Sequence, residues 1–398
     1  MVQLPYAMIT RRLTHPRLWL CAGLAFLMFW QMDRMRSVAP MTDFLAYWSG
    51  ARVLVSGGNP YSSAQMLQTQ AAAGWKESDT LHMWNPPWTL TFFVPLAVFS
   101  YGTGYMVFLV FNLVILLLCG GITWRVMGGK ATEQRVAWFV ATSFFPALAT
   151  LGFGQMGALL LFGIVLFLRY CDSRPLLAGA ATVLIALKPQ LPYLFWISLL
   201  FWALQHRCWR VLAGMAGALA TAALVPSILR PQIWSEYLEF ARSGAMLGYP
   251  SPTLGTLLRL CFGGDRDWLQ FVPSVAGTAW FLLYWRYRRF TWDWKAQLPI
   301  LLLVSVATTP YGWLFDQMVL LPALIEIAAS VSARSSPGSS RLIAVYAALN
   351  LGIVLSVALK VTGAAYAWTA PAWLLAYLFA KWQIAPAVQV DTAAAAAT

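Results

Sequence analysis

The sequence predicts an all-α polytopic membrane protein with a bundle of about 12 transmembrane helices. Of its 398 residues, 60% are hydrophobic and only 10% are charged, which excludes an ordinary soluble globular protein. Apolar runs near the ~20 residues needed to cross a bilayer recur from Pro16 to Lys381. No polar stretch between them is long enough for a soluble domain. We therefore expect one integral membrane domain over residues 1–385 and a disordered, Ala-rich tail over 386–398.

The apolar runs place the spans in order. We expect the first to be a retained signal-anchor, because its apolar part is long and no clean small-residue cleavage site follows it immediately; a signal peptide, with Ser37-Val38-Ala39 as a weak cleavage site, is the alternative. The second run is too long for one simple helix, and Pro86, Pro87, Pro95 and the Gly-rich break at 101–104 predict a short leading segment before a full span. The expected spans are 16–32, 86–124, 136–151, 155–170, 175–187, 191–204, 211–229, 268–285, 298–310, 316–332, 342–360 and 364–380.

The net charge of +13 is explained by membrane topology. If residues 86–124 cross the bilayer once, 17 of the 27 basic residues fall in short connections on one side, which identifies that side as cytoplasmic. Both termini are then cytoplasmic, and the long loops 33–85 and 230–267 face the periplasm or exterior of a cell (inner) membrane. If residues 86–124 crossed the bilayer twice, every later loop would lie on the opposite side of the membrane. The basic balance therefore does not indicate a nucleic-acid partner.

The same topology collects the unusual polar motifs on the non-cytoplasmic side. A shared location makes these motifs the strongest functional signal in the chain. They are Asp43 through Tyr61, Trp84-Asn85-Pro86-Pro87-Trp88, Gly152-Phe153-Gly154-Gln155, Lys188-Pro189-Gln190 and Thr309 through Gln317.

The first outer loop begins with Asp43, which has two readings. Thr42 and Asp43 are ordinary N-cap residues, so Asp43 could cap a helix on the membrane surface. A carboxylate beside the membrane could also act as a base on a substrate carried by lipid. Aromatic residues at helical spacing, including Tyr47, predict two amphipathic juxtamembrane helices divided by the break at 56–60. His82 and Trp84, which precede the Pro-Pro pair, are candidates to line a cavity together with Asp43.

Lys188 lies at a Pro-containing break between two apolar helices. An ammonium near the membrane needs an anionic partner or a polar cavity, and a lipid phosphate held by Lys188 and the Gln190 amide fits that need. A snorkelling lysine at a tight turn is the alternative. Asp316 follows a Pro-Tyr-Gly break and is expected to pair with Lys188, to orient Tyr311 or to touch substrate.

The corner at residues 152–155 places the amide of Gln155 where two glycines permit close backbone approach. A plain helix-turn-helix corner explains the same residues. The five cysteines are scattered and predict neither a disulfide framework nor a metal site. We expect no obligatory metal and no other cofactor.

Taken in order, these motifs resemble glycosyltransferase family 87, a group of integral-membrane, GT-C-type enzymes that use polyprenyl-phosphate sugars and include mannosyltransferases. The resemblance runs from about residue 43 to 322. The usual Tyr-Pro-Pro is replaced by Asn85-Pro86-Pro87, which leaves the acceptor and the sugar open. The matching motifs are Asp43-Phe44 with Tyr47, Gly57 through Tyr61, Asn85-Pro86-Pro87 with Pro95-Leu96-Ala97, Gly154-Gln155, Lys188-Pro189-Gln190 and Pro310-Tyr311 with Asp316.

The resemblance implies transfer of a hexose, with mannose the leading candidate, from a polyprenyl-phosphate donor to a lipid-linked or envelope glycan acceptor at the outer face. Asp43 matches the catalytic carboxylate after the first span, and one base suffices for inverting displacement. Lys188 or Arg52 would face the departing phosphate. Tyr47, Trp84, Gln155, Gln190, Tyr311 and Asp316 are expected to bind substrate. The alternatives are a transporter or lipid-glycan flippase, which should show paired broken helices in two halves, and a non-enzymatic scaffold.

Overall fold

The structure is a computed structural model that describes residues 40–244, 250–263, 265–334 and 339–384. Within these ranges the chain is helical and contains no strand, which confirms the predicted all-α class. The expected signal-anchor at 16–32 and the expected tail at 386–398 lie outside the described residues.

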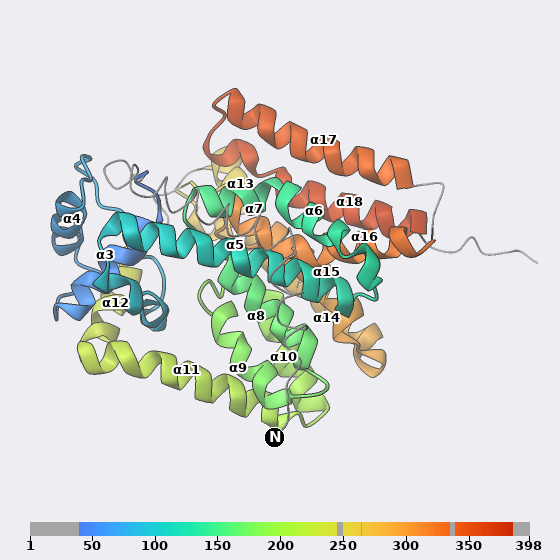
Figure 1. Ribbon diagram of the computed structural model, residues 1–398, viewed down its shortest axis with the longest axis horizontal. Coiled ribbons are helices and arrows are strands. Elements are labelled where there is room, and N and C mark those ends of the chain that lie inside the picture. Colours follow the sequence, from blue (N-terminus) through green and yellow to red (C-terminus); the bar gives the residue numbers. More distant parts are fainter. Residues whose placement is uncertain (1–39, 245–249, 264, 335–338, 385–398) are drawn as a thin grey trace, which may run out of the picture.

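A bundle of helices forms most of the molecule, and α5, α15, α16, α17 and α18 run in similar directions across it (Figure 1). Most helix boundaries agree with the predicted spans to within a few residues. The bundle helices are α5 (Tyr101–Val126), α6 (Arg135–Ser143), α7 (Phe145–Gly152), α8 (Gly157–Tyr170), α9 (Pro175–Ile185), α10 (Tyr193–Gln205), α11 (Trp209–Leu229), α14 (Val272–Arg288), α15 (Trp294–Thr308), α16 (Leu321–Arg334), α17 (Ser339–Ala358) and α18 (Thr369–Ile384).

Among the described residues, fewer helices than predicted are long enough to span a bilayer. Four qualify by length and composition, namely Tyr101–Val126, Trp209–Leu229, Leu314–Ala333 and Ser340–Ala358, and α6 with α7, bent by 59°, would make a fifth. Others, such as the 11-residue α9, extend only about 17 Å. Several of these short helices end at Pro- or Gly-containing breaks, where irregular backbone is tolerated because it lines a cavity within protein.

The expected leader before the second span is confirmed. Two 3₁₀ helices, η1 (Pro87–Phe92) and η2 (Val94–Val98), precede α5. Trp88 Nε1 donates to the carbonyl of Ala186 at 2.9 Å, and Thr91 Oγ1 donates to the carbonyl of Ala222 at 2.6 Å. The leader is thereby fixed against α9 and α11, and it brings the Asn85-Pro86 segment to the end of α9.

The two expected helices of the first outer loop are present as α3 (Phe44–Val55) and α4 (Ser63–Ala72). They lie with α12 (Ile233–Arg242) at one end of α5 and α11, at the left of Figure 1. The α3 helix is more buried than a helix lying in the membrane interface, because every residue except Arg52 and Val55 is covered. Its Phe44 ring stacks on Phe108 with centroids 5.0 Å apart. This packing fixes the first turn of α3, and with it Asp43.

The second outer loop is not an open loop. Its described part contains α12, α13 (Leu254–Phe262) and the 3₁₀ helix η5 (Asp267–Phe271). Arg230, at the end of α11, donates to Glu236 in α12 at 2.5–2.9 Å and to the carbonyl of Gly57 at 2.6 Å. The two outer loops are therefore joined to each other, a contact that the sequence did not predict.

Candidate active site

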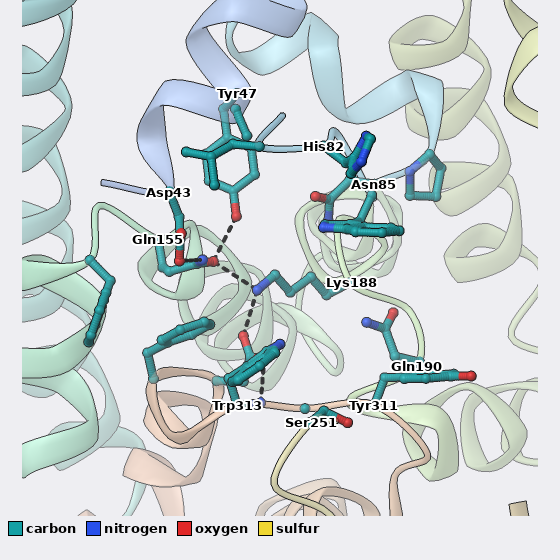
Figure 2. Close-up of a pocket in the computed structure, with 18 of the residues that line it drawn as sticks. Asp43, Tyr47, His82, Asn85, Gln155, Lys188, Gln190, Ser251, Tyr311 and Trp313 are labelled. Carbon is teal, nitrogen blue, oxygen red and sulfur yellow. Dashed lines mark hydrogen bonds and ion pairs between the residues drawn. The ribbon is translucent and has the colours of Figure 1, made fainter. Parts of the chain in front are cut away.

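A cavity of about 510 Å³ lies where the outer loops meet the ends of the bundle helices. Five chain segments far apart in sequence supply most of its wall: the start of α3, residues 81–86, the 153–155 corner, the 188–190 break and residues 311–316. Figure 2 shows their side chains pointing toward one another around Lys188. The polar motifs that the sequence placed on one face of the membrane thus converge on one cavity.

Gln155 connects the charged groups of this cavity. Its Nε2 donates to Asp43 Oδ2 at 2.7 Å, and its Oε1 accepts from Lys188 Nζ at 2.8 Å and from the Tyr47 hydroxyl at 2.7 Å. The amide is only 5% exposed. One buried side chain therefore ties α3 to the break between α9 and α10.

The chemistry of the partners determines which way this amide faces. An ammonium donates hydrogen bonds and cannot accept them, so the Gln155 atom that meets Lys188 must be the oxygen. The nitrogen then faces Asp43, and a donated N–H is what a carboxylate accepts. The orientation is consistent with both contacts, whereas a flipped amide would break both.

Lys188 sits between the end of α9 and the start of α10, as the sequence predicted. Its ammonium lies 2.7 Å from Asp316 Oδ1 and 5.1 Å from the centre of the Phe315 ring. With Gln155 this accounts for two of its three N–H bonds among the described residues. The ion pair is buried, with the Asp316 residue 3% exposed, and this explains how a lysine is tolerated there.

Asp316 is the partner of Lys188 that the sequence left as one of three options. Its second oxygen accepts from the backbone N–H of Trp313 at 2.9 Å, which closes the turn before η7 (Leu314–Leu320). Both oxygens are therefore satisfied by protein groups. The hydrogen bonds make Asp316 the counter-ion of Lys188 and an organiser of this turn.

Asp43 differs from Asp316 in both contacts and exposure. It occupies the N-cap position of α3, but its side chain makes no capping hydrogen bond and turns instead to Gln155. The carboxylate is half-buried at the cavity wall. Burial raises the pKa of Asp43 above its ordinary value, against the opposing effects of the Gln155 hydrogen bond and the Lys188 charge. A half-buried carboxylate of this kind has the properties of a general base.

Glycine is required in the 152–155 corner at only one of the two positions predicted. Gly154 has φ +63°, and a Cβ there would lie 2.8 Å from both Phe44 Cβ and Thr42 Oγ1. At Gly152 a Cβ would meet nothing within 4 Å. Gly154 thus lets the corner approach α3, where the carbonyl of Phe153 accepts from the Asp43 backbone N–H at 3.1 Å.

All but one of the predicted site residues line the cavity. Arg52 does not: it is exposed, its guanidinium donates to the carbonyl of Ala97 at 2.7 Å and lies over the Trp48 ring. We therefore leave it out of the proposed site. The predicted residues that line the cavity are Asp43, Tyr47, Trp84, Gln155, Lys188, Gln190, Tyr311 and Asp316, and the weaker candidate His82 joins them.

Two polar lining residues, Tyr237 and Ser251, were not predicted from the sequence. Both come from the 230–267 region, which carried no motif. The amphipathic pattern of α12 was the one available signal for Tyr237, and nothing in the sequence distinguishes Ser251 from any other loop serine. Among the described residues, no group of three or more His, Cys, Asp or Glu side chains is arranged to hold a metal ion.

Comparison with known families decides the class of protein. Residues 84–315 match the family described as glycosyltransferase family 87, which is more than half of the chain. The chain belongs to glycosyltransferase family 87. No curated protein and no solved structure matches it.

Family membership and the apolar helices together indicate a membrane-embedded glycosyltransferase. The matched region of this family 87 protein contains Gln155, Lys188 and Gln190. Asp43 lies before it, and Asp316 follows directly after it. The hydrogen bonds of Gln155 and Lys188 connect both carboxylates to the matched region.

Proposed function

We propose that the protein transfers a hexose, with mannose the leading candidate, from a polyprenyl-phosphate donor to a lipid-linked or envelope glycan acceptor. One observation carries the proposal. In this member of glycosyltransferase family 87, the half-buried carboxylate of Asp43 and the buried ammonium of Lys188 line one cavity and are joined through the Gln155 amide. A base for an acceptor hydroxyl and a cation for a departing phosphate are the two charges that such a transfer requires.

The reaction is an inverting displacement at the anomeric carbon. The acceptor hydroxyl oxygen attacks this carbon while its proton passes to Asp43. The bond from the anomeric carbon to the phosphate oxygen breaks, and its electron pair leaves with the polyprenyl phosphate. One carboxylate suffices for this course because no covalent sugar intermediate is formed.

Lys188 would receive the phosphate. Two of its N–H bonds are held by Gln155 and Asp316, so its ammonium is fixed in place with a third N–H available to a ligand oxygen. Negative charge grows on the phosphate as the sugar leaves, and a positioned cation stabilises that change most strongly in a cavity sheltered from water. Gln190 and Tyr311, at the same wall, would contact the substrate.

The proposed setting is a cell (inner) membrane with the cavity at the periplasmic or exterior face. Both termini are cytoplasmic, and residues 1–385 form one integral domain of GT-C type. Several apolar helices are shorter than a full membrane span. In this proposal they complete a bundle of about 12 membrane segments, with broken segments around the cavity. The polyprenyl chain of the donor would then remain in the lipid while its sugar phosphate enters the cavity.

The experiment is a transfer assay with the purified full-length protein in lipid nanodiscs. Synthetic polyprenyl-phosphate mannose, polyprenyl-phosphate glucose and the corresponding nucleotide sugars are offered separately, with a glycolipid extract of cells lacking the protein as acceptor. We expect product only with a polyprenyl-phosphate sugar and with inverted anomeric configuration. Transfer from a nucleotide sugar, or a retained configuration, would contradict the proposal.

A further inference from the structure

The most connected neutral side chain of the cavity is Gln155. Its amide meets a carboxylate, an ammonium and a phenol at 2.7–2.8 Å, and these three groups come from α3 and the 188–190 break. An amide carries no charge and is a poor base, so its place among charged groups indicates a role in arranging them.

Gln155 stands between the two groups on which the proposed reaction depends. Lys188 pairs with Asp316 on one side and donates to the Gln155 oxygen on the other. The Gln155 nitrogen holds Oδ2 of Asp43, and Asp43 lines the cavity. A direct ion pair between Lys188 and Asp43 would occupy the carboxylate and reduce its basicity.

We propose that Gln155 is a positioning residue, which holds one oxygen of Asp43 and keeps the ammonium of Lys188, already paired with Asp316, from pairing with Asp43 as well. The inference rests on the proposed function, because it assigns Gln155 through the roles of the two charged residues. The carbonyl of Thr150 fixes the corner by accepting from the Gln155 backbone N–H at 2.9 Å. The position of the amide is therefore set by the fold before any substrate arrives.

The proposal predicts how the rate depends on pH. Among the described residues, the ionisable groups around Asp43 are Lys188 and Asp316, together with the phenols of Tyr47 and Tyr101. An N–H bond from an amide favours the charged form of the carboxylate, and its loss raises the pKa of the base. The acid limb of kcat/KM should consequently move to higher pH when the amide is removed.

The test uses the full-length enzyme, with a synthetic polyprenyl-phosphate hexose as the probe. In Gln155→Met, which keeps the length of the side chain but removes its amide, we expect the acid limb to rise by about one pH unit. In Gln155→Glu, a negative charge replaces the donor, and we expect a larger shift in the same direction. Tyr47→Phe is the matched control, since it removes another partner of the same amide but leaves Asp43 its donor.

The outcomes separate this inference from the proposed function. An inactive wild-type enzyme would contradict the function itself. If the wild-type enzyme is active and the Gln155→Met and Gln155→Glu variants lose rate without any movement of the acid limb, Gln155 is merely structural. A shift in Tyr47→Phe equal to that of Gln155→Met would also overturn the proposal.

A second observation concerns the opposite part of the cavity. Ser251 is 2% exposed, and among the described residues its buried hydroxyl has no hydrogen-bond partner, although it lines the cavity. A buried hydroxyl without a partner is costly, and one aimed into a cavity is explained most simply by a ligand. Figure 2 shows Ser251 and Tyr311 on the far side of Lys188 from Asp43, with Gln190 near them.

The cavity also has an aromatic wall. His82, Trp84 and Tyr237 line the cavity, and Phe240 stands behind them with its ring 5.3 Å from Trp84 and 5.6 Å from His82. Tyr61 contacts both Tyr237 and Phe240, so α12 is packed against the first outer loop. A rigid aromatic surface and hydrogen-bonding groups in one cavity suit a ligand with one apolar face and a rim of hydroxyls.

We infer that Ser251 and Tyr237 form a pyranose subsite. The ring belongs either to the acceptor or to the donor, and the two Michaelis constants distinguish these sources. In Ser251→Ala we expect a rise of about 2- to 10-fold in KM for one substrate, with kcat and the acid limb unchanged, because a neutral hydrogen bond has been lost. Tyr237→Leu should raise the same KM.

Ser235→Ala is the control for this subsite, since Ser235 lies on α12 but is exposed and bonded to the carbonyl of Gln232. A rise in the acceptor KM assigns the ring to the acceptor, and a rise in the donor KM assigns it to the donor. If neither Michaelis constant changes in Ser251→Ala and Tyr237→Leu, the subsite does not exist.

Discussion

The two carboxylates of the cavity, Asp43 and Asp316, make different hydrogen bonds. Both oxygens of Asp316 are engaged, by Lys188 and the backbone of Trp313, whereas among the described residues only one oxygen of Asp43 accepts a hydrogen bond, from Gln155. Residue type alone could not distinguish them, because both were single aspartates beside a helix break. Their hydrogen bonds do, and they favour Asp43 as the base.

Activity and stability should respond to pH in opposite directions at Asp43. Burial raises the pKa of this carboxyl in the folded protein, so its reactive deprotonated form is lost earlier as pH falls. The folded state also binds this proton more strongly than the unfolded chain, so Asp43 makes the protein less stable as pH rises through its pKa. A pH profile of kcat/KM should show an acid limb above the ordinary value near 3.8, and its disappearance in Asp43→Asn identifies the group. An acid limb that survives in this variant would belong to another residue.

Substitutions in the buried ion pair of Lys188 and Asp316 should affect the stability of the protein and its transfer activity differently. Lys188→Met leaves the Asp316 carboxylate buried without its cation, and we expect a loss of about 3–5 kcal/mol in unfolding free energy. Adding Asp316→Asn should restore most of this stability but no transfer, since the phosphate still lacks a cation. Unfolding in mild detergent measures the first effect and the transfer assay the second.

Lys381→Met is the matched comparison, because Lys381 pairs with Glu326 at 2.7 Å but is 49% exposed. Its effect on stability should be within about 1 kcal/mol. Transfer by the double variant of Lys188 and Asp316 would contradict the role of Lys188.

At the scale of elements, breaks in the pattern were as informative as the helices. Pro and Gly located the leader before α5, the gap between α9 and α10, and the turn before η7, because these residues interrupt helices for local reasons. The helices α12 and α13 were not predicted, although both are amphipathic, because the 230–267 region carried no motif and no long apolar run. Tyr237, on α12, and Ser251, just before α13, lie in this region and were missed with it.

The corner that carries Gln155 should tolerate alanine at one glycine and not at the other. Gly154→Ala forces a left-handed backbone onto a residue with a Cβ and brings that atom against Phe44 and Thr42. A displaced amide should lower kcat/KM about 10- to 100-fold. Gly152→Ala should leave the rate within about twofold, because open space surrounds that position. Equal effects in the transfer assay would show that the geometry of the corner is unimportant.

The contact between α9 and α11 depends on small residues. A Cβ on Gly179 would lie 1.9 Å from the carbonyl oxygen of Val211, whereas one on Gly217 would meet nothing within 4 Å. Gly179→Ala should therefore lower the unfolding free energy by about 1–3 kcal/mol. Gly217→Ala should be neutral or stabilise α11 by up to about 1 kcal/mol. Detergent unfolding curves compare the two, and a destabilised Gly217→Ala would contradict this packing.

At the scale of the whole molecule, the proposed topology places the cavity outside the cytoplasm. A reporter fused after Lys130 should be cytoplasmic, and one inserted after Arg242 should be external. The reason is that basic residues gather in the short connections on one side. An external reporter at Lys130 would mean that residues 86–124 cross differently and that the cavity opens to another compartment.

The class of the protein and most of its site were accessible from sequence because hydrophobicity and ordered motifs are local signals. The number of spans could not be predicted from the sequence. Residues in the short helices are apolar for two different reasons, contact with lipid and burial around the cavity. The same limit applies to Arg52, whose charge fitted a phosphate but whose guanidinium faces Ala97. Only the folded arrangement assigns a direction to a side chain.

The most direct measurement is the rate of hexose transfer from polyprenyl phosphate by Asp43→Asn, compared with wild type and with Asp79→Asn. Asp79 lies in the same loop, is exposed and is absent from the cavity wall, so it controls for loss of a loop carboxylate. Removing a general base should lower kcat about 10²- to 10⁴-fold in Asp43→Asn, and Asp79→Asn should retain the wild-type rate. Wild-type kcat in a folded Asp43→Asn enzyme would contradict the central claim.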